Sequence, residues 1–145
     1  MQEALKEAEA AFRAGEVPVG AVVVFEGRII GRGRNRMEEL SDPSAHAEMM
    51  AINEARRNLK IKLLEGAELY CTLEPCPMCA GAAILHRVQR VIYGAPDLRW
   101  GGCGTIFNIP EEPRLNHRIE IIGGVMEEEC RELLRRFFEQ RRGIV

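Results

Sequence analysis

The chain has 145 residues, of which 46% are hydrophobic and 29% are charged, and its formal net charge is -2. This composition favours a globular protein over a disordered or fibrous one, and the length predicts a single domain over residues 1–145. The small net charge excludes long-range attraction of an anionic partner, so such a partner would need a local basic patch.

Membrane insertion and export are not expected. The first seven residues lack the apolar core of a signal peptide, and the longest apolar run, residues 21–25, is too short to span a bilayer. The cysteines number five, and two of them are spaced for a metal rather than for a disulfide framework. We therefore expect a cytoplasmic protein that does not bind membranes.

Hydrophobic periodicity and turn residues predict nine elements along the chain. Strands are expected at residues 19–25, 28–34, 68–73, 90–94 and 118–122. Helices are expected at residues 1–14, 44–58, 77–86 and 126–142. Ser44 is the expected N-cap of the second helix, and residues 35–43 are expected to form a loop.

The order of these elements predicts the architecture. The first two strands flank Glu26-Gly27, which favours an antiparallel hairpin. After residue 44 the strands alternate with helices, and parallel neighbours need such crossovers. The expected fold is a three-layer α/β/α arrangement, in which a mixed five-stranded sheet carries helices on both faces.

A metal site is predicted by His46, Cys76 and Cys79, which are three ligands of the kind that zinc takes. Pro77 favours a helix start directly after Cys76, so both sulfurs would lie at a helix N-terminus, where the helix dipole favours thiolates. Catalytic zinc sites leave the fourth position to water. Glu48 is the expected proton acceptor for that water.

Two steps of this interpretation are open at the level of sequence. Residues two apart point to nearly opposite sides of a regular helix, so His46 and Glu48 can share a site only at a helix end. A structural zinc would need a fourth protein ligand, and the spacing does not exclude Cys103. Cys71 and Cys130 are expected to be buried thiols. His86 lies too far along its helix to join Cys79 on one ion. A redox-active cysteine pair is the remaining alternative.

His46-Ala47-Glu48 followed by Pro75-Cys76-Pro77-Met78-Cys79 resembles the signature of zinc-dependent nucleobase deaminases. More specifically, the chain is similar to the bacterial tRNA wobble-adenosine deaminases, which have a cytidine deaminase-like fold. The similarity extends over essentially the whole chain. It is carried by residues 16–21, 42–48, 72–82, 116–118 and 137–138.

This resemblance implies a function and a set of site residues. One Zn²⁺ per subunit, held by His46, Cys76 and Cys79, would activate a water, and catalytic Glu48 would move its proton while adenosine becomes inosine. The implied partners are a tRNA anticodon stem-loop and a second copy in a homodimer. The residues implied to contact the RNA are Val17, Pro18, Asn35, Asp97, Phe138 and Arg142.

Several of these contact residues have a simpler interpretation. Asn35 and Asp97 could be turn residues, and a row of arginines at positions 32, 34 and 36 could contact phosphate or could simply be solvated. Phe137 and Phe138 are adjacent, so a helix can bury only one of them. Arg99-Trp100 departs from the family, which often has lysine and a small or polar residue there.

Two other functions compete with tRNA editing. The first is deamination of a free base or nucleoside. The second is a non-enzymatic role, in which zinc stabilises an RNA-binding subunit that supports another deaminase. An intact Glu48 argues against the second.

Overall fold

The computed structural model describes residues 1–143 and contains five strands and five helices. The strands are β1 (Gly20–Phe25), β2 (Arg28–Arg34), β3 (Glu68–Leu73), β4 (Arg90–Ala95) and β5 (Glu120–Ile122). The helices are α1 (Gln2–Arg13), α2 (Met37–Leu40), α3 (Ala47–Leu59), α4 (Pro77–Leu85) and α5 (Glu127–Gly143).

The strands form one mixed sheet in the order β2-β1-β3-β4-β5. β1 pairs with both β2 and β3 in antiparallel fashion, whereas β3, β4 and β5 run parallel. The predicted hairpin and the predicted parallel strands are thus confirmed. The crossover from β4 to β5, residues 96–119, contains no helix, and we refer to it as the β4–β5 connection.

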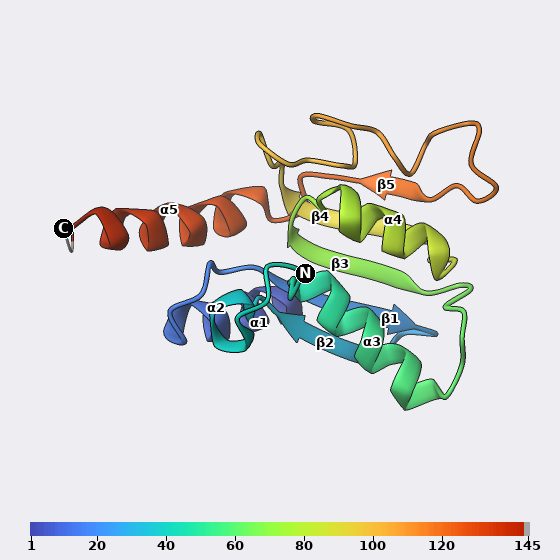
Figure 1. Cartoon of the computed structure of the whole chain (residues 1–145), viewed down its shortest axis with the longest axis horizontal. Coiled ribbons are helices and arrows are strands. Elements are labelled where there is room, and N and C mark those ends of the chain that lie inside the picture. Colours follow the sequence, from blue (N-terminus) through green and yellow to red (C-terminus); the bar gives the residue numbers. More distant parts are fainter. Residues whose placement is uncertain (144–145) are drawn as a thin grey trace.

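Helices cover both faces of the sheet, as the three-layer prediction requires (Figure 1). α3 and α4 lie on one face, and α1 and α5 lie on the other. The buried core lies mainly between the sheet and the α3 face, where Ile52, Leu69 and Val91 are fully or almost fully buried. Both α3 and α4 begin at the edge where β3 and β4 end, which is where parallel strands gather functional side chains.

Glycines in β2 let α3 approach the sheet closely. A Cβ atom at Gly31 would lie 2.3 Å from the carbonyl oxygen of Ala51, and one at Gly33 would lie 2.2 Å from that of Ala47. No side chain fits at these distances, so α3 rests with its alanine face directly on the β2 backbone. This contact fixes the start of α3, immediately after His46, against the end of β2.

The segment before α3 differs from the prediction in two ways. Residues 37–40 of the expected loop form the short helix α2, and α3 begins at Ala47, with His46 as its N-cap. Ser44 is not the cap; its hydroxyl and its backbone N–H both donate to Oδ1 of Asp42, which holds residues 42–44 in a turn. The cap is His46, two residues later than predicted.

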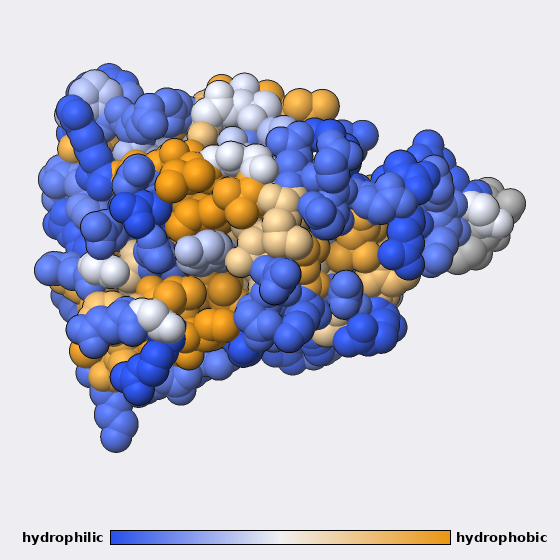
Figure 2. All heavy atoms as spheres, turned by 180° about the vertical axis from the view of Figure 1, so that it is seen from behind, coloured by the Kyte–Doolittle hydropathy of each residue, from blue (hydrophilic) through white to orange (hydrophobic). Residues whose placement is uncertain are grey.

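The face of the molecule that is turned away from the viewer in Figure 1 carries an apolar patch. Figure 2 shows hydrophobic side chains gathered in the middle of this face, with hydrophilic side chains around them. Ile29 and Ile122, in the two edge strands, are among the exposed large hydrophobic residues of the protein.

Across residues 1–143, the helices are too short or too polar to cross a bilayer.

Candidate zinc and substrate site

The three predicted metal ligands meet in space. Nδ1 of His46 lies 3.5 Å from Sγ of Cys76 and 3.5 Å from Sγ of Cys79, and the three ligand atoms lie within 4.8 Å of one another. A tetrahedral zinc, with Zn–S of about 2.3 Å and Zn–N of about 2.0–2.1 Å, separates such atoms by about 3.5 Å. The geometry and the donor set therefore both fit Zn²⁺.

Two helix N-termini hold these ligands. Cys76 is the N-cap of α4, with Pro77 at the first helical position, and Cys79 lies in the first turn of that helix. His46 has extended backbone, with φ -78° and ψ 151°, and caps α3. Because His46 precedes the first helical turn, the rule for residues two apart on a helix does not apply to it. Its ring and the Glu48 carboxyl can thus face one cavity.

Without a bound metal, the protonation of the site follows from its geometry. A hydrogen bond from the Cys79 thiol, with a second from His46, lowers the pKa of Cys76 to about 4, and the same bond raises the pKa of Cys79. The bond to Cys76 also raises the pKa of His46. Glu48 is buried, and this burial raises its pKa to about 7, close to the value that suits proton transfer at neutral pH.

The candidates for a fourth ligand lie elsewhere. Among the described residues, the cluster of metal-binding side chains contains His46, Cys76 and Cys79, and Cys103 is outside it. Cys71 and Cys130 are buried, as predicted, and burial raises the pKa of both thiols. Three protein ligands are the number that catalytic zinc sites have.

A cavity of about 600 Å³ opens beside these ligands. His46, Cys76 and Glu48 line it. Of the predicted RNA-contacting residues, Val17, Asn35 and Asp97 line it as well. Pro18 is fully buried and is not among the lining residues, so its place beside the nucleotide stays a prediction.

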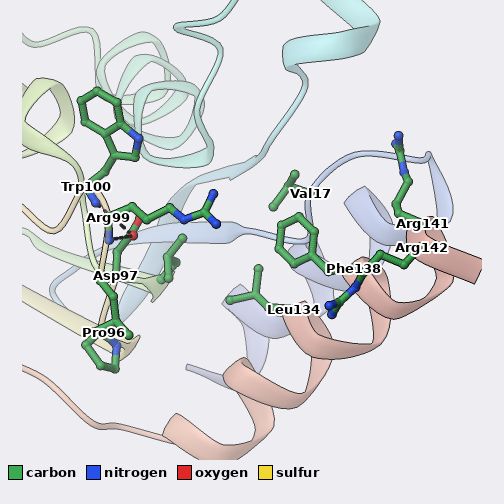
Figure 3. A pocket seen from close by; sticks show the side chains of 11 residues that line it. Val17, Pro96, Asp97, Arg99, Trp100, Leu134, Phe138, Arg141 and Arg142 are labelled. Carbon is green, nitrogen blue, oxygen red and sulfur yellow. Dashed lines mark hydrogen bonds between the residues drawn. The ribbon is translucent and has the colours of Figure 1, made fainter.

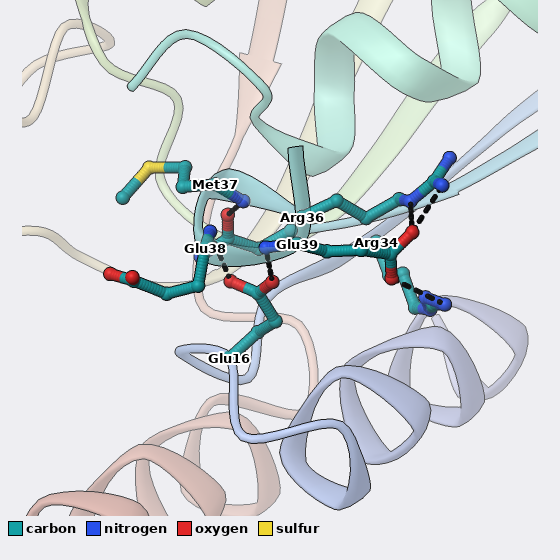
Figure 4. A network of polar contacts seen from close by, with 7 residues as sticks. Glu16, Arg34, Arg36, Met37, Glu38 and Glu39 are labelled. Carbon is teal, nitrogen blue, oxygen red and sulfur yellow. Dashed lines mark hydrogen bonds and ion pairs between the residues drawn. The ribbon is translucent and has the colours of Figure 1, made fainter. Parts of the chain in front are cut away.

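Asn35 is held in the cavity wall by the backbone around it. Its Nδ2 donates to the carbonyl of Val17, and its Oδ1 accepts from the backbone N–H of Met37. Buried Glu16 accepts from the N–H groups of Glu38 and Glu39, so the unpaired donors at the start of α2 are satisfied (Figure 4). Asn35 is therefore a turn residue and a cavity residue at once.

Asp97 combines the same two roles. Its Oδ1 accepts from the backbone N–H groups of Arg99 and Trp100, which is the turn chemistry expected of an aspartate in a loop. Its backbone N–H donates to Oε1 of Glu74, a residue that is buried at the end of β3. Trp100 lines the cavity next to Asp97, although 65% of its surface is exposed.

A second hollow, of about 800 Å³, lies between α5 and the β4–β5 connection. In Figure 3, Phe138 and Leu134 of α5 lie across this hollow from Asp97 and Trp100. Phe138 and Arg142 line the hollow and not the first cavity. The two hollows share Val17, Leu73, Asp97 and Trp100, so they are continuous along one surface.

The adjacent phenylalanines of α5 separate as predicted. Phe137 is buried, with its ring centroid 5.7 Å from that of Phe12, and Phe138 is 46% exposed. The arginine row is instead engaged within the protein: Arg32 pairs with Glu3 and Glu7, and Arg34 and Arg36 pair with Glu39. These intramolecular ion pairs argue against the interpretation that the arginine row contacts phosphate.

Sequence reasoning assigned no role to Glu16 or Glu74, although both stood in the stretches that carry the resemblance. Each is a buried carboxylate that accepts backbone hydrogen bonds from a segment lining the cavity. Their signal in the sequence is an acidic residue among apolar neighbours and prolines, Glu16-Val17-Pro18 and Leu73-Glu74-Pro75. Their hydrogen-bond partners lie more than 20 residues away, and only the fold identifies them.

Known proteins resemble this chain in sequence and in fold. A model of the cytidine and deoxycytidylate deaminase zinc-binding region matches residues 1–95. A tRNA-specific adenosine deaminase of Aquifex aeolicus is 53% identical over 142 residues, which cover 98% of this chain and 93% of that protein.

Two solved structures have a similar fold. One comes from studies of A-to-I editing by tRNA:A34 deaminases at the wobble position of transfer RNA; it aligns with a TM-score of 0.88 and 42% identity, over 92% of this chain and 96% of that one. A guanine deaminase from Nitrosomonas europaea aligns with a TM-score of 0.77 and 27% identity, over 94% of this chain and 81% of that one. The predicted cytidine deaminase-like fold is confirmed. The chain belongs to the cytidine and deoxycytidylate deaminase zinc-binding family and, within it, to the tRNA-specific adenosine deaminases.

Proposed function

We propose that this protein deaminates adenosine to inosine at the wobble position of a tRNA anticodon loop. The observation that carries the proposal is the cavity in which His46, Cys76 and buried Glu48 meet, in a chain that is 53% identical to a tRNA-specific adenosine deaminase. A base must leave its stack to enter such a cavity, and a single-stranded loop allows this at a low energetic cost.

Glu48 is the proposed catalytic residue. His46, Cys76 and Cys79 would hold a zinc ion, which would supply a Lewis acid that activates a water near neutral pH. The Glu48 carboxylate accepts a proton from the attacking water and delivers it to N1 of adenine as the oxygen adds to C6. A second proton transfer through Glu48 lets the C6–N6 bond break and ammonia leave, which yields inosine.

The walls of the cavity orient the base in this proposal. Val17 packs against it, and the side chains of Asn35 and Asp97, both lining the cavity, contact the nucleotide. Phe138 and Arg142 contact neighbouring nucleotides in the second hollow, where an exposed ring can stack on a base and a guanidinium can bind phosphate.

The competing substrate is a free purine, which the structural similarity to a guanine deaminase favours. The test is to incubate the zinc-loaded protein with an anticodon stem-loop RNA, adenosine, adenine and guanine, and to measure the products by mass-resolved nucleoside analysis. We expect inosine from the RNA alone and a steep loss of RNA binding with added salt. Faster turnover of a free base than of the hairpin would contradict the proposal.

We further propose a cytoplasmic homodimer. This part of the proposal is supported by the family resemblance and by the cytoplasmic location of tRNA, and sedimentation equilibrium of the zinc-loaded protein tests the dimer. The alternative of a non-enzymatic zinc-stabilised subunit predicts four protein ligands. Metal-edge absorption spectroscopy that finds four protein donors and no exchangeable water would favour that alternative.

A further inference from the structure

Glu74 is a buried carboxylate between the end of β3 and the metal ligand Cys76, with 1% of its surface exposed. Both of its oxygens accept hydrogen bonds from the β4–β5 connection. Oε1 accepts from the backbone N–H of Asp97 and from the Thr105 hydroxyl, and Oε2 accepts from the backbone N–H groups of Cys103, at 3.0 Å, and Thr105, at 3.1 Å. One side chain thus ties together both ends of residues 97–105.

These nine residues form a wall of the cavity. Asp97 and Trp100 line both the cavity and the second hollow. The segment also folds back onto the metal-binding motif, because the backbone N–H of Gly102 donates to the carbonyl of Pro75 at 2.8 Å. The segment contains no helix or long strand of its own, so its shape depends on the groups that satisfy its backbone.

We propose that Glu74 is a positioning residue for the deamination, acting through residues 97–105 to set the wall that receives the nucleotide. This inference rests on the proposed function for its effect on substrate, but the effect of Glu74 on residues 97–105 can be measured without substrate. Glutamate suits the task because both of its side-chain oxygens can accept hydrogen bonds, and the four groups bonded to them are all donors.

Glu74→Gln tests this role with almost no change in shape. The amide nitrogen of Gln turns two N–H groups toward donors of the connection, so buried donors lose their acceptor, and one such loss is worth about a tenfold change in an equilibrium. We expect KM for an anticodon stem-loop RNA to rise about tenfold, kcat to change less than about threefold, and bound zinc to stay at one per chain. A mere loss of folded enzyme would instead lower kcat and leave KM unchanged.

Hydrogen exchange gives a second readout that needs no substrate. The amides of Asp97, Cys103 and Thr105 bond to Glu74, and we expect their exchange to speed up at least tenfold in Glu74→Gln, while core amides such as those of β1 stay protected. Unchanged exchange at these three amides would overturn the proposal. Failure of the wild-type protein to act on any RNA would overturn the proposed function and leave this readout intact.

Thr105→Val is a milder variant in case Glu74→Gln folds poorly. It removes the hydroxyl that donates to Oε1 and keeps the backbone bond to Oε2. We expect a two- to threefold rise in KM alone and no further rise in the Glu74→Gln background, because both changes act on one network. If the KM increases of the two single variants multiplied in the double variant, the result would contradict the proposal.

Glu112→Gln is the matched control. Glu112 lies in the same connection but is only half-buried and pairs with exposed Arg114. We expect KM, kcat, zinc content and amide exchange of this control to match the wild type. A rise in KM equal to that of Glu74→Gln would show that any charge loss in the connection has this effect, which would overturn the specific role of Glu74.

Discussion

The side-chain amide of Asn35 donates a hydrogen bond to the carbonyl of Val17, with 3.2 Å between Nδ2 and O, and so ties two walls of the cavity together. The opposite end of the same amide accepts from Met37. A single side chain therefore connects the loop before β1 with the start of α2, beside the proposed substrate.

Asn35→Asp separates the two bonds of this side chain. The carboxylate can still accept from the N–H of Met37, but it cannot donate to Val17, whose part-buried carbonyl then faces a negative oxygen. We expect the free energy of unfolding to fall by about 1–3 kcal/mol and kcat/KM on the RNA to fall about tenfold or more. Urea unfolding and steady-state kinetics measure the two effects. Lower stability with unchanged kcat/KM would show that Asn35 is only a turn residue.

Glu48→Gln removes the proposed proton carrier and keeps the size of the side chain. We expect kcat to fall by about 10²–10⁴, the range typical of general acid–base catalysis, with zinc retained at one per chain. Inosine formation and metal analysis are the measurements. Glu54→Gln, six residues further along α3 and outside the cavity, is the control and should keep wild-type activity. Turnover near the wild-type rate in Glu48→Gln would exclude the proposed role.

Removal of zinc by a chelator should abolish inosine formation and expose one reactive thiol. The pKa of Cys76 is lowered to about 4 in the metal-free site, so this half-buried sulfur is a thiolate at pH 6, where an ordinary thiol is almost fully protonated. We expect iodoacetamide at pH 6 to modify Cys76 first, at a rate that changes little between pH 6 and pH 8. Peptide mass mapping identifies the site.

The other cysteines serve as internal controls for that experiment. Burial raises the pKa of Cys71, Cys103 and Cys130, so these residues should stay unmodified in the folded chain. Added Zn²⁺ should protect Cys76 and restore activity. Modification of Cys103 before Cys76 would argue that Cys103 belongs to the metal site.

Phe137 and Phe138 offer a comparison of two neighbours with opposite surroundings. Phe137→Ala empties a buried position against Phe12 and should lower the free energy of unfolding by about 3–5 kcal/mol. Phe138→Ala should change stability by no more than about 0.5 kcal/mol, but weaken RNA binding by about 1–3 kcal/mol through lost stacking. Thermal unfolding measures the stability of both variants, and fluorescence anisotropy with a labelled hairpin measures their RNA binding. Unaltered binding in Phe138→Ala would remove this ring from the RNA site.

The sequence by itself determined every element except α2, and it predicted the three zinc-binding side chains and Glu48, which the fold brings together. Periodicity and turn residues are local, so strands such as β3 and helices such as α4 could be predicted within one or two residues. The ligands could be predicted because zinc selects few side chains, and Cys76 and Cys79 have the spacing of one helical turn.

Tertiary structure alone decided how these parts serve the site. Ser44 could cap a helix by residue type, yet it lies in a turn with Asp42, outside α3. His46 is the cap instead, and this position lets His46 and Glu48 line one cavity. In the sequence, Glu74 is distinguished only as an acidic residue between Leu73 and Pro75. Its role depends on which backbone N–H groups lie unpaired beside it after folding, and those belong to residues 97–105, more than 20 positions away. Hydrogen-bond partners across such distances follow from packing of the whole chain, which local sequence patterns do not encode.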